Sequence, residues 1–166
     1  MKGRLASTFF AALIVLVLVA AGAFGLPAFT TWPKSSTGKG GQAELFDIAT
    51  GCHTTYDRFV IDARSATPGY DVRYVDQVFA DPSGQPVSLL GRKRIRVVIR
   101  PARGVMDVTT DPLSSVILPA CPNLRHVRTV GNFEGTVSFG LGLRRMTGFR
   151  VFRLTHPARV VVDIAH

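Results

Sequence analysis

Cysteine is scarce in this chain of 166 residues, which holds only Cys52 and Cys121. Two cysteines are too few for a disulfide-dense miniprotein or for a four-cysteine zinc ribbon, so both classes are excluded. Acidic residues are also few: 11 Asp and Glu stand against 20 Lys and Arg, giving a formal net charge of +9. Charged residues make up 19% of the chain and hydrophobic residues 46%, a balance that excludes disorder throughout.

A helical period is missing from the chain after residue 26, and 16 glycines with 10 prolines favour many turns over a helical bundle. Short segments instead alternate between two faces. Phe59, Ile61 and Ala63 share one side of such a segment, which predicts a half-buried strand. Further strands are expected at 70–79, 87–90, 94–100, 115–118, 127–130, 137–143, 149–154 and 159–164. About eight short strands separated by turns predict an all-β fold, an antiparallel sandwich or barrel.

The N-terminus carries a targeting pattern. Lys2 and Arg4 precede residues 9–26, a stretch of 18 residues without any charge. A basic start followed by an apolar run is typical of an export signal. The run also approaches the length of a membrane span, so an uncleaved anchor through residues 9–26 is the alternative. We therefore predict an N-terminal apolar helix over residues 1–28, as signal peptide or membrane anchor, and an extracytoplasmic location for the rest.

Residues 29–42 are rich in Thr, Ser, Gly, Pro and Lys. This composition cannot bury a core and predicts a flexible linker, with the folded domain at 43–166. Export would place both cysteines in an oxidising compartment, where an even count predicts one disulfide between Cys52 and Cys121. Two buried free thiols are the alternative.

One short pattern occurs twice in the chain. Residues 58–63 and 159–164 both run Arg, apolar, Val, β-branched, Asp, apolar. Within each copy the arginine and the aspartate are four residues apart on one strand face, too far to pair with each other. Exposed strand faces that each happen to carry one charge of either sign would explain the repetition equally well.

Four segments together resemble the AMIN-like domain of secreted actinobacterial proteins, a relative of the AMIN module found beside cell-wall amidases and in secretins. Residues 51–62 are similar to the family's Gly-x-His-x-x-aromatic-Asp-Arg opening, and 68–75 to its second strand. Residues 131–143 are similar to its Phe-Glu-Gly segment and 149–166 to its ending, so the resemblance spans 43–166. It implies a sandwich of two packed sheets that serves as an exported binding or targeting module. AMIN modules are associated with peptidoglycan binding.

Motifs for catalysis or metal binding are lacking. The four histidines are scattered, and Cys52 and His53 are adjacent, so on an extended chain they point to opposite faces. Neither a Gly-x-Ser-x-Gly elbow nor a phosphate-binding loop is present. The glycines of 135–142 are better explained by the close approach of another backbone or ring. We expect no enzyme activity, no cofactor and no metal.

A group of arginines is the most distinctive feature of the predicted surface. Arg94, Arg96 and Arg100 share one face of a predicted strand and could hold carboxylates, phosphates or sulfates. A solvated edge that discourages strand pairing is the alternative. The corner at 51–58 offers a second candidate group of ligand-binding residues, although Asp57 could simply cap a turn. The residues of that second group are His53, Asp57 and Arg58.

These observations predict an exported, non-catalytic module that recognises peptidoglycan or another anionic component of the cell wall. A module that docks on another envelope protein is the alternative, and an undetected wall hydrolase is a third. Nucleic acid is excluded as a partner because export would remove the protein from the compartment that holds it.

Overall fold

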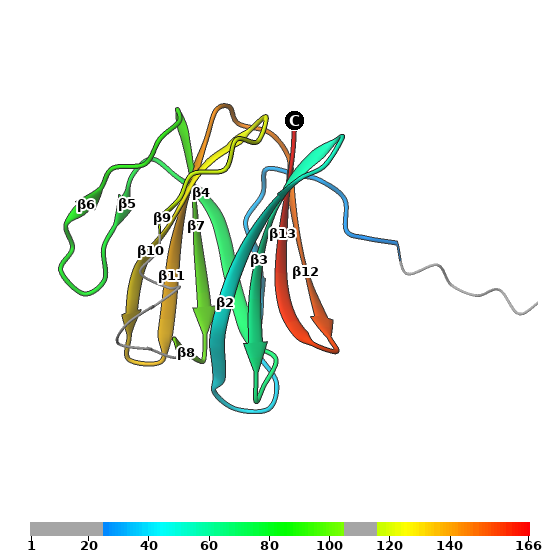
Figure 1. Ribbon diagram of the computed structural model, residues 1–166. Helices are drawn as coiled ribbons and strands as arrows, with labels where there is room; N and C mark the ends of the chain where they lie inside the picture. Colours follow the sequence, from blue (N-terminus) through cyan, green and yellow to red (C-terminus); the bar gives the residue numbers. More distant parts are fainter. Residues whose placement is uncertain (1–24, 105–115) are drawn as a thin grey trace, which may run out of the picture.

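Residues 25–104 and 116–166 are described by the computed structural model of the protein. They form thirteen strands and no helix, which confirms the predicted all-β fold. Two sheets pack face to face as a sandwich (Figure 1). Residues 1–24, which hold most of the predicted signal or anchor, lie outside the described part of the chain. Within that part, no helix is long and apolar enough to cross a membrane.

The larger sheet has six strands, and each neighbouring pair in it is antiparallel. Its order is β1 (Lys34–Ser36), β4 (Gly69–Val75), β7 (Lys93–Arg100), β11 (Thr136–Leu143), β10 (Leu124–Phe133) and β9 (Val116–Ile117).

The smaller sheet has five strands and departs from the purely antiparallel arrangement that we predicted. Its order is β12 (Phe149–Thr155), β13 (Ala158–Ala165), β3 (Tyr56–Arg64), β2 (Ala43–Cys52) and β8 (Ala102–Gly104). Strand β8 runs parallel to β2 at the edge of this sheet, so the sheet is mixed.

Strand β2 was not predicted, and its register explains why. A bulge between Leu45 and Asp47 shifts its pairing with β3 by one residue. The buried positions of the strand are therefore Ala43, Leu45 and Ile48 rather than every second residue. Because a bulge moves the inward side chains from odd to even positions, the alternation that marks a strand in the sequence is lost.

The segment 29–42, which we expected to be a flexible linker, is instead bound to both sheets. Thr30 forms a bridge with Phe149 at the start of β12, and β1 pairs with β4 of the other sheet. The Lys34 ammonium lies 3.9 Å from the centre of the Phe149 ring, and partial burial lowers the pKa of Lys34. The segment is ordered by backbone hydrogen bonds, which its polar composition does not reveal.

The core lies between the sheets, where the predicted strand faces are confirmed. Phe59 and Ile61 of β3 are fully buried on one side, and Ile95 and Val97 of β7 on the other. The Phe59 ring packs edge-on against Phe139 of the facing sheet, with ring centres 5.4 Å apart.

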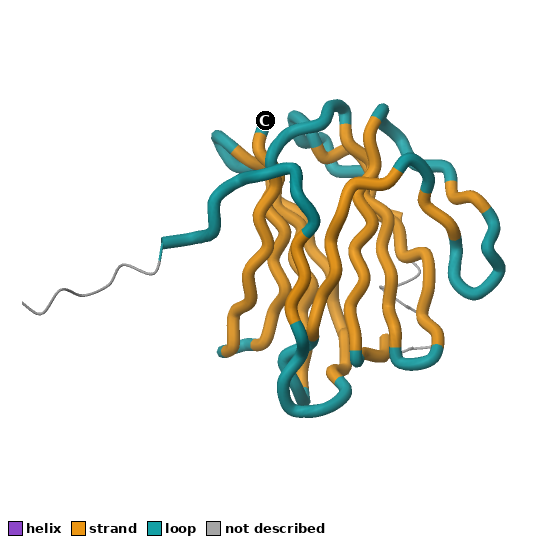
Figure 2. The backbone as a smooth tube through the Cα atoms, turned by 180° about the vertical axis from the view of Figure 1, so that it is seen from behind, coloured by secondary structure: helices purple, strands orange, loops and turns teal. Residues whose placement is uncertain are grey.

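A short hairpin lies outside the sandwich. Strands β5 (Val78–Phe79) and β6 (Pro86–Val87) pair with each other and extend beside the six-stranded sheet, as both views show (Figures 1 and 2). A Cβ atom at Gly140 of β11 would lie 2.9 Å from Leu89 and 3.1 Å from Val78. The glycines of β11 therefore make room for the chain that covers this sheet, as we expected from the sequence.

Candidate functional site

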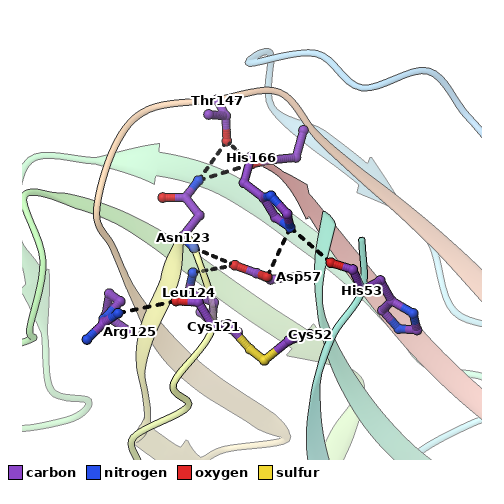
Figure 3. Close-up of polar contacts among 10 residues, drawn as sticks. Cys52, His53, Asp57, Cys121, Asn123, Leu124, Arg125, Thr147 and His166 are labelled. Carbon is purple, nitrogen blue, oxygen red and sulfur yellow. Dashed lines mark hydrogen bonds and ion pairs between the residues drawn. A yellow bond between two sulfur atoms is a disulfide. The ribbon is translucent and has the colours of Figure 1, made fainter. Parts of the chain in front are cut away.

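The corner between β2 and β3 is held by a disulfide and a buried carboxylate (Figure 3). Cys52 and Cys121 form the predicted disulfide, with Cα atoms 5.2 Å apart. Asp57 is fully buried, and its Oδ2 accepts hydrogen bonds from the backbone N–H groups of Asn123 and Leu124, both at 2.7 Å. The bridge and the carboxylate thus tie the start of β10 to the first strands of the other sheet.

His166, not His53, approaches Asp57. The His166 Nε2 atom lies 3.4 Å from Asp57 Oδ1 and 3.1 Å from the backbone oxygen of His53 (Figure 3). The His53 ring instead stacks on Tyr56, with ring centres 4.5 Å apart. Asp57 has no exposed surface and accepts hydrogen bonds from backbone amides at the beginning of β10, so in our interpretation it has a structural role.

Asn123 completes this closed network. Its Nδ2 donates to Thr147 Oγ1 at 2.9 Å and to the Ala165 carbonyl at 3.1 Å, while its Oδ1 accepts from the Arg145 N–H at 3.0 Å. The sulfur atoms of the bridge and the Asp57 carboxylate lie within 4.8 Å of one another. The two sulfurs are bonded to each other and offer no thiolate, so this grouping does not match a metal site.

Arg58, the third candidate at this corner, is engaged with Asp163 of β13. Its Nε lies 2.6 Å from Asp163 Oδ1, and Arg150 Nε lies 2.9 Å from Asp163 Oδ2. The Asp163 side chain is fully buried beneath the two guanidinium groups. Its hydrogen bond to Arg58 raises the pKa of that arginine. Phe29 and Tyr56 cover the Arg150 guanidinium, with ring centres at 4.4 and 5.2 Å.

The predicted arginine face leads to a cleft on the outer side of the six-stranded sheet. This β4–β7 cleft has a volume of about 590 Å³. Arg73 of β4 and Arg96 and Arg100 of β7 supply its positive charge. The remaining lining residues are Asp71, Val75, Asp81, Pro82, Val98, Phe133, Glu134 and Thr136.

The β4–β7 cleft contains three arginines and three carboxylates, and two of the arginines are in ion pairs. Arg73 pairs with Asp71, and Arg96 Nη2 lies 2.6 Å from Asp81 Oδ2. The Asp71 contact raises the pKa of Arg73. Arg100 is exposed and makes no ion pair with any described carboxylate. A free guanidinium of this kind can form paired hydrogen bonds with a ligand carboxylate or phosphate.

Arg94, the third arginine of the predicted face, does not line this cleft. Its Nη1 donates to the backbone oxygen of Asp76 at 3.2 Å. Sequence reasoning missed Arg73 and Phe133. Arg73 lies opposite Arg96 in the β4–β7 register, and Phe133 is the last residue of β10. Neither neighbour relation can be obtained from the alternation of a single strand.

A family model for the AMIN-like domain matches residues 43–166. The chain belongs to the AMIN-like domain family. No curated protein shows significant similarity to it. The corner, the Arg58–Asp163 pair and the β4–β7 cleft all lie within the matched residues. Thr30, which forms a β-bridge with Phe149, and strand β1 lie before the matched residues and extend the domain at its N-terminal side.

Proposed function

We propose that this AMIN-like protein is an exported, non-catalytic module that binds peptidoglycan, or another anionic wall component, through the β4–β7 cleft. The observation that carries the proposal is the exposed Arg100 in a cleft with Phe133 at its border. The Phe133 side chain is 49% exposed. Peptidoglycan presents carboxylates of its peptides close to sugar rings, so a free guanidinium in the same cleft as an exposed aromatic ring suits both parts of the polymer.

The association of AMIN-related modules with the cell wall supports this proposal, and so does the excess of basic over acidic residues. Wall polymers carry negative charge, and a basic surface increases their local concentration near the protein. Because Arg73 and Arg96 pair with Asp71 and Asp81, Arg100 is the arginine of the cleft left for a ligand, which favours a defined contact over general attraction.

Co-sedimentation of the full chain with purified insoluble wall tests the proposal. The variant Arg96→Gln/Arg100→Gln should bind at least about tenfold more weakly, because a single guanidinium contact to an anion contributes roughly 1.5–3 kcal/mol and tenfold corresponds to about 1.4 kcal/mol. The matched control Arg64→Gln/Arg103→Gln removes the same charge from arginines that both contact Glu44, outside the cleft. It should bind like the parent.

Varying the salt concentration and the composition of the wall tests the type of ligand. Binding should weaken between about 0.1 and 1 M salt, as the screening length falls from roughly 10 to 3 Å. Wall stripped of its covalently attached anionic polymers should retain the protein if peptidoglycan is the ligand. Equal binding by the cleft variant and its control would refute the proposal, and release of soluble wall fragments would indicate a hydrolase instead.

A further inference from the structure

A second concave surface lies at one end of the sandwich, beside the last residue of β11. It has a volume of about 490 Å³ and shares no lining residue with the β4–β7 cleft. Three arginines from separate segments line it: Arg92 precedes β7, Arg125 belongs to β10, and Arg144 follows β11. The other lining residues are Leu90 and Gly91.

The backbone holds these segments in place. Gly91 has a φ of +104°, and a Cβ atom there would lie 2.3 Å from the Leu143 carbonyl oxygen, so only glycine fits. The next N–H, that of Arg92, donates to the same carbonyl at 2.7 Å. The Arg144 N–H donates to the Asn123 carbonyl at 2.9 Å. The arginines therefore extend from a fixed frame rather than from loose turns.

The positive charge of this pocket is not compensated by described carboxylates. Seven arginines in the described ranges pair with an acidic side chain, and Arg92, Arg125 and Arg144 are not among them. Arg125 donates to the Cys121 carbonyl at 3.3 Å, which leaves its charge in place. Three arginines that line one concave surface give it a net positive charge, which a bound anion would offset.

The number of guanidinium groups indicates which anion. Elsewhere in the molecule the single carboxylate of Asp163 is occupied by two guanidinium groups, those of Arg58 and Arg150. Three such groups call for more acceptor atoms and more charge. A terminal phosphate has three free oxygens and a charge of about −1.5 to −2 at pH 7, whereas a phosphodiester has two free oxygens and a single charge.

We propose that Arg92, Arg125 and Arg144 form an arginine pocket that binds a terminal phosphate or pyrophosphate group. The site is separate from the wall-binding cleft and does not depend on the function proposed for that cleft. A protein with both sites could hold a wall polymer and a phosphorylated ligand at the same time.

Calorimetric titration of the full chain at constant ionic strength tests the arginine pocket. Inorganic phosphate and pyrophosphate should bind, and dimethyl phosphate and acetate should bind at least about tenfold more weakly. A preference for pyrophosphate over phosphate assigns the site to a diphosphate ligand, and equal affinity assigns it to a phosphate monoester. Equal affinity for all four anions would overturn the proposal.

Variants and spectroscopy locate the binding. Arg92→Gln/Arg125→Gln/Arg144→Gln should lower pyrophosphate affinity at least about tenfold. The control Arg64→Gln/Arg103→Gln/Arg153→Gln loses the same formal charge outside the arginine pocket and should change it less than about twofold. In the parent, pyrophosphate should shift the side-chain Nε–Hε resonances of the three pocket arginines and not those of the cleft. Retained binding in the first variant, or shifts confined to the cleft, would refute the site.

Discussion

Arg58 on β3 lies directly opposite Asp163 on β13, although 105 residues separate them in the chain. The same two antiparallel strands place Arg159 opposite Asp62, with Arg159 Nε 2.5 Å from Asp62 Oδ1. The repeated pattern at 58–63 and 159–164 is thereby explained: the arginine of each copy pairs with the aspartate of the other. The four-residue spacing, too long for pairing within one strand, is matched across two strands.

Of these two ion pairs, Arg58–Asp163 is the more buried and should contribute more to the free energy of unfolding. Asp163→Asn leaves the guanidinium groups of Arg58 and Arg150, whose side chains are 26% and 13% exposed, without a counter-charge. Removing one partner of a buried ion pair typically costs about 3–5 kcal/mol, so the free energy of unfolding should fall by about 3 kcal/mol. Urea denaturation of the parent and the variant measures this loss.

Asp62→Asn supplies the matched control for that measurement, because it makes the same substitution in the second ion pair, that of Arg159 and Asp62. The Arg159 side chain is 38% exposed and can be solvated when its partner is lost. The expected loss is about 1 kcal/mol or less. Equal losses at the two positions would contradict the role that we assign to burial.

The disulfide should contribute strongly to stability. Cys52 and Cys121 are 69 residues apart, and closing a loop of this length lowers the entropy of the unfolded chain by an amount worth about 4 kcal/mol at most. Reductant should therefore lower the urea midpoint of the parent. It should leave the already weakened Cys52→Ser/Cys121→Ser variant unchanged. A parent whose midpoint does not respond to reductant would show that the bridge adds little.

Gly142 should tolerate no side chain. A Cβ atom there would lie 2.0 Å from the Leu90 carbonyl oxygen and 3.1 Å from the His126 Cβ. Gly142→Ala must push the segment at Leu90 away from β11, which should lower the free energy of unfolding by about 1–3 kcal/mol. Gly51→Ala is the control, because its Cβ would meet only His53 Nε2, at an ordinary 3.6 Å. Thermal denaturation of the two variants should separate them clearly.

The sequence was sufficient to predict which side chains are buried where the residues of a single strand alternate regularly. Phe59, Ile61 and Ala63 alternate regularly and are buried as predicted, because side chains of an unbroken strand point to opposite sides in turn. The same logic failed for β2, where the bulge after Leu45 changes the inward positions. Local alternation contains no information about a bulge that depends on the neighbouring strand.

The candidate site was predictable only in part for a related reason. The arginines of β7 could be placed on one face, but Arg73 joins them through the β4–β7 register and Phe133 through the end of β10. The approach of His166 to Asp57 likewise depends on how distant segments of the chain meet. Such neighbours are set by the pairing of strands, and no motif in a single segment encodes that pairing.

His126 of β10 binds the backbone at Leu90, and it should make the stability of the fold depend on pH. Its side chain is buried, and its Nδ1 accepts a hydrogen bond from the Leu90 N–H at 3.0 Å, which requires an unprotonated nitrogen. Burial, and to a lesser degree the charge of Arg128, lowers the pKa of His126 below its ordinary value of 6.5. The unfolded chain therefore binds this proton more readily than the folded protein does.

The contribution of His126 to the free energy of unfolding should be complete above pH 6.5, the ordinary pKa that the unfolded chain retains. It should decline as the pH falls from there through the lower pKa of the folded state, because protonation then favours the unfolded chain. His126→Asn keeps a hydrogen-bond acceptor but cannot titrate, so its unfolding free energy should fall less steeply over this range in urea titrations at successive pH values. A His126→Asn slope identical to that of the parent would mean that the buried imidazole is not the group responsible.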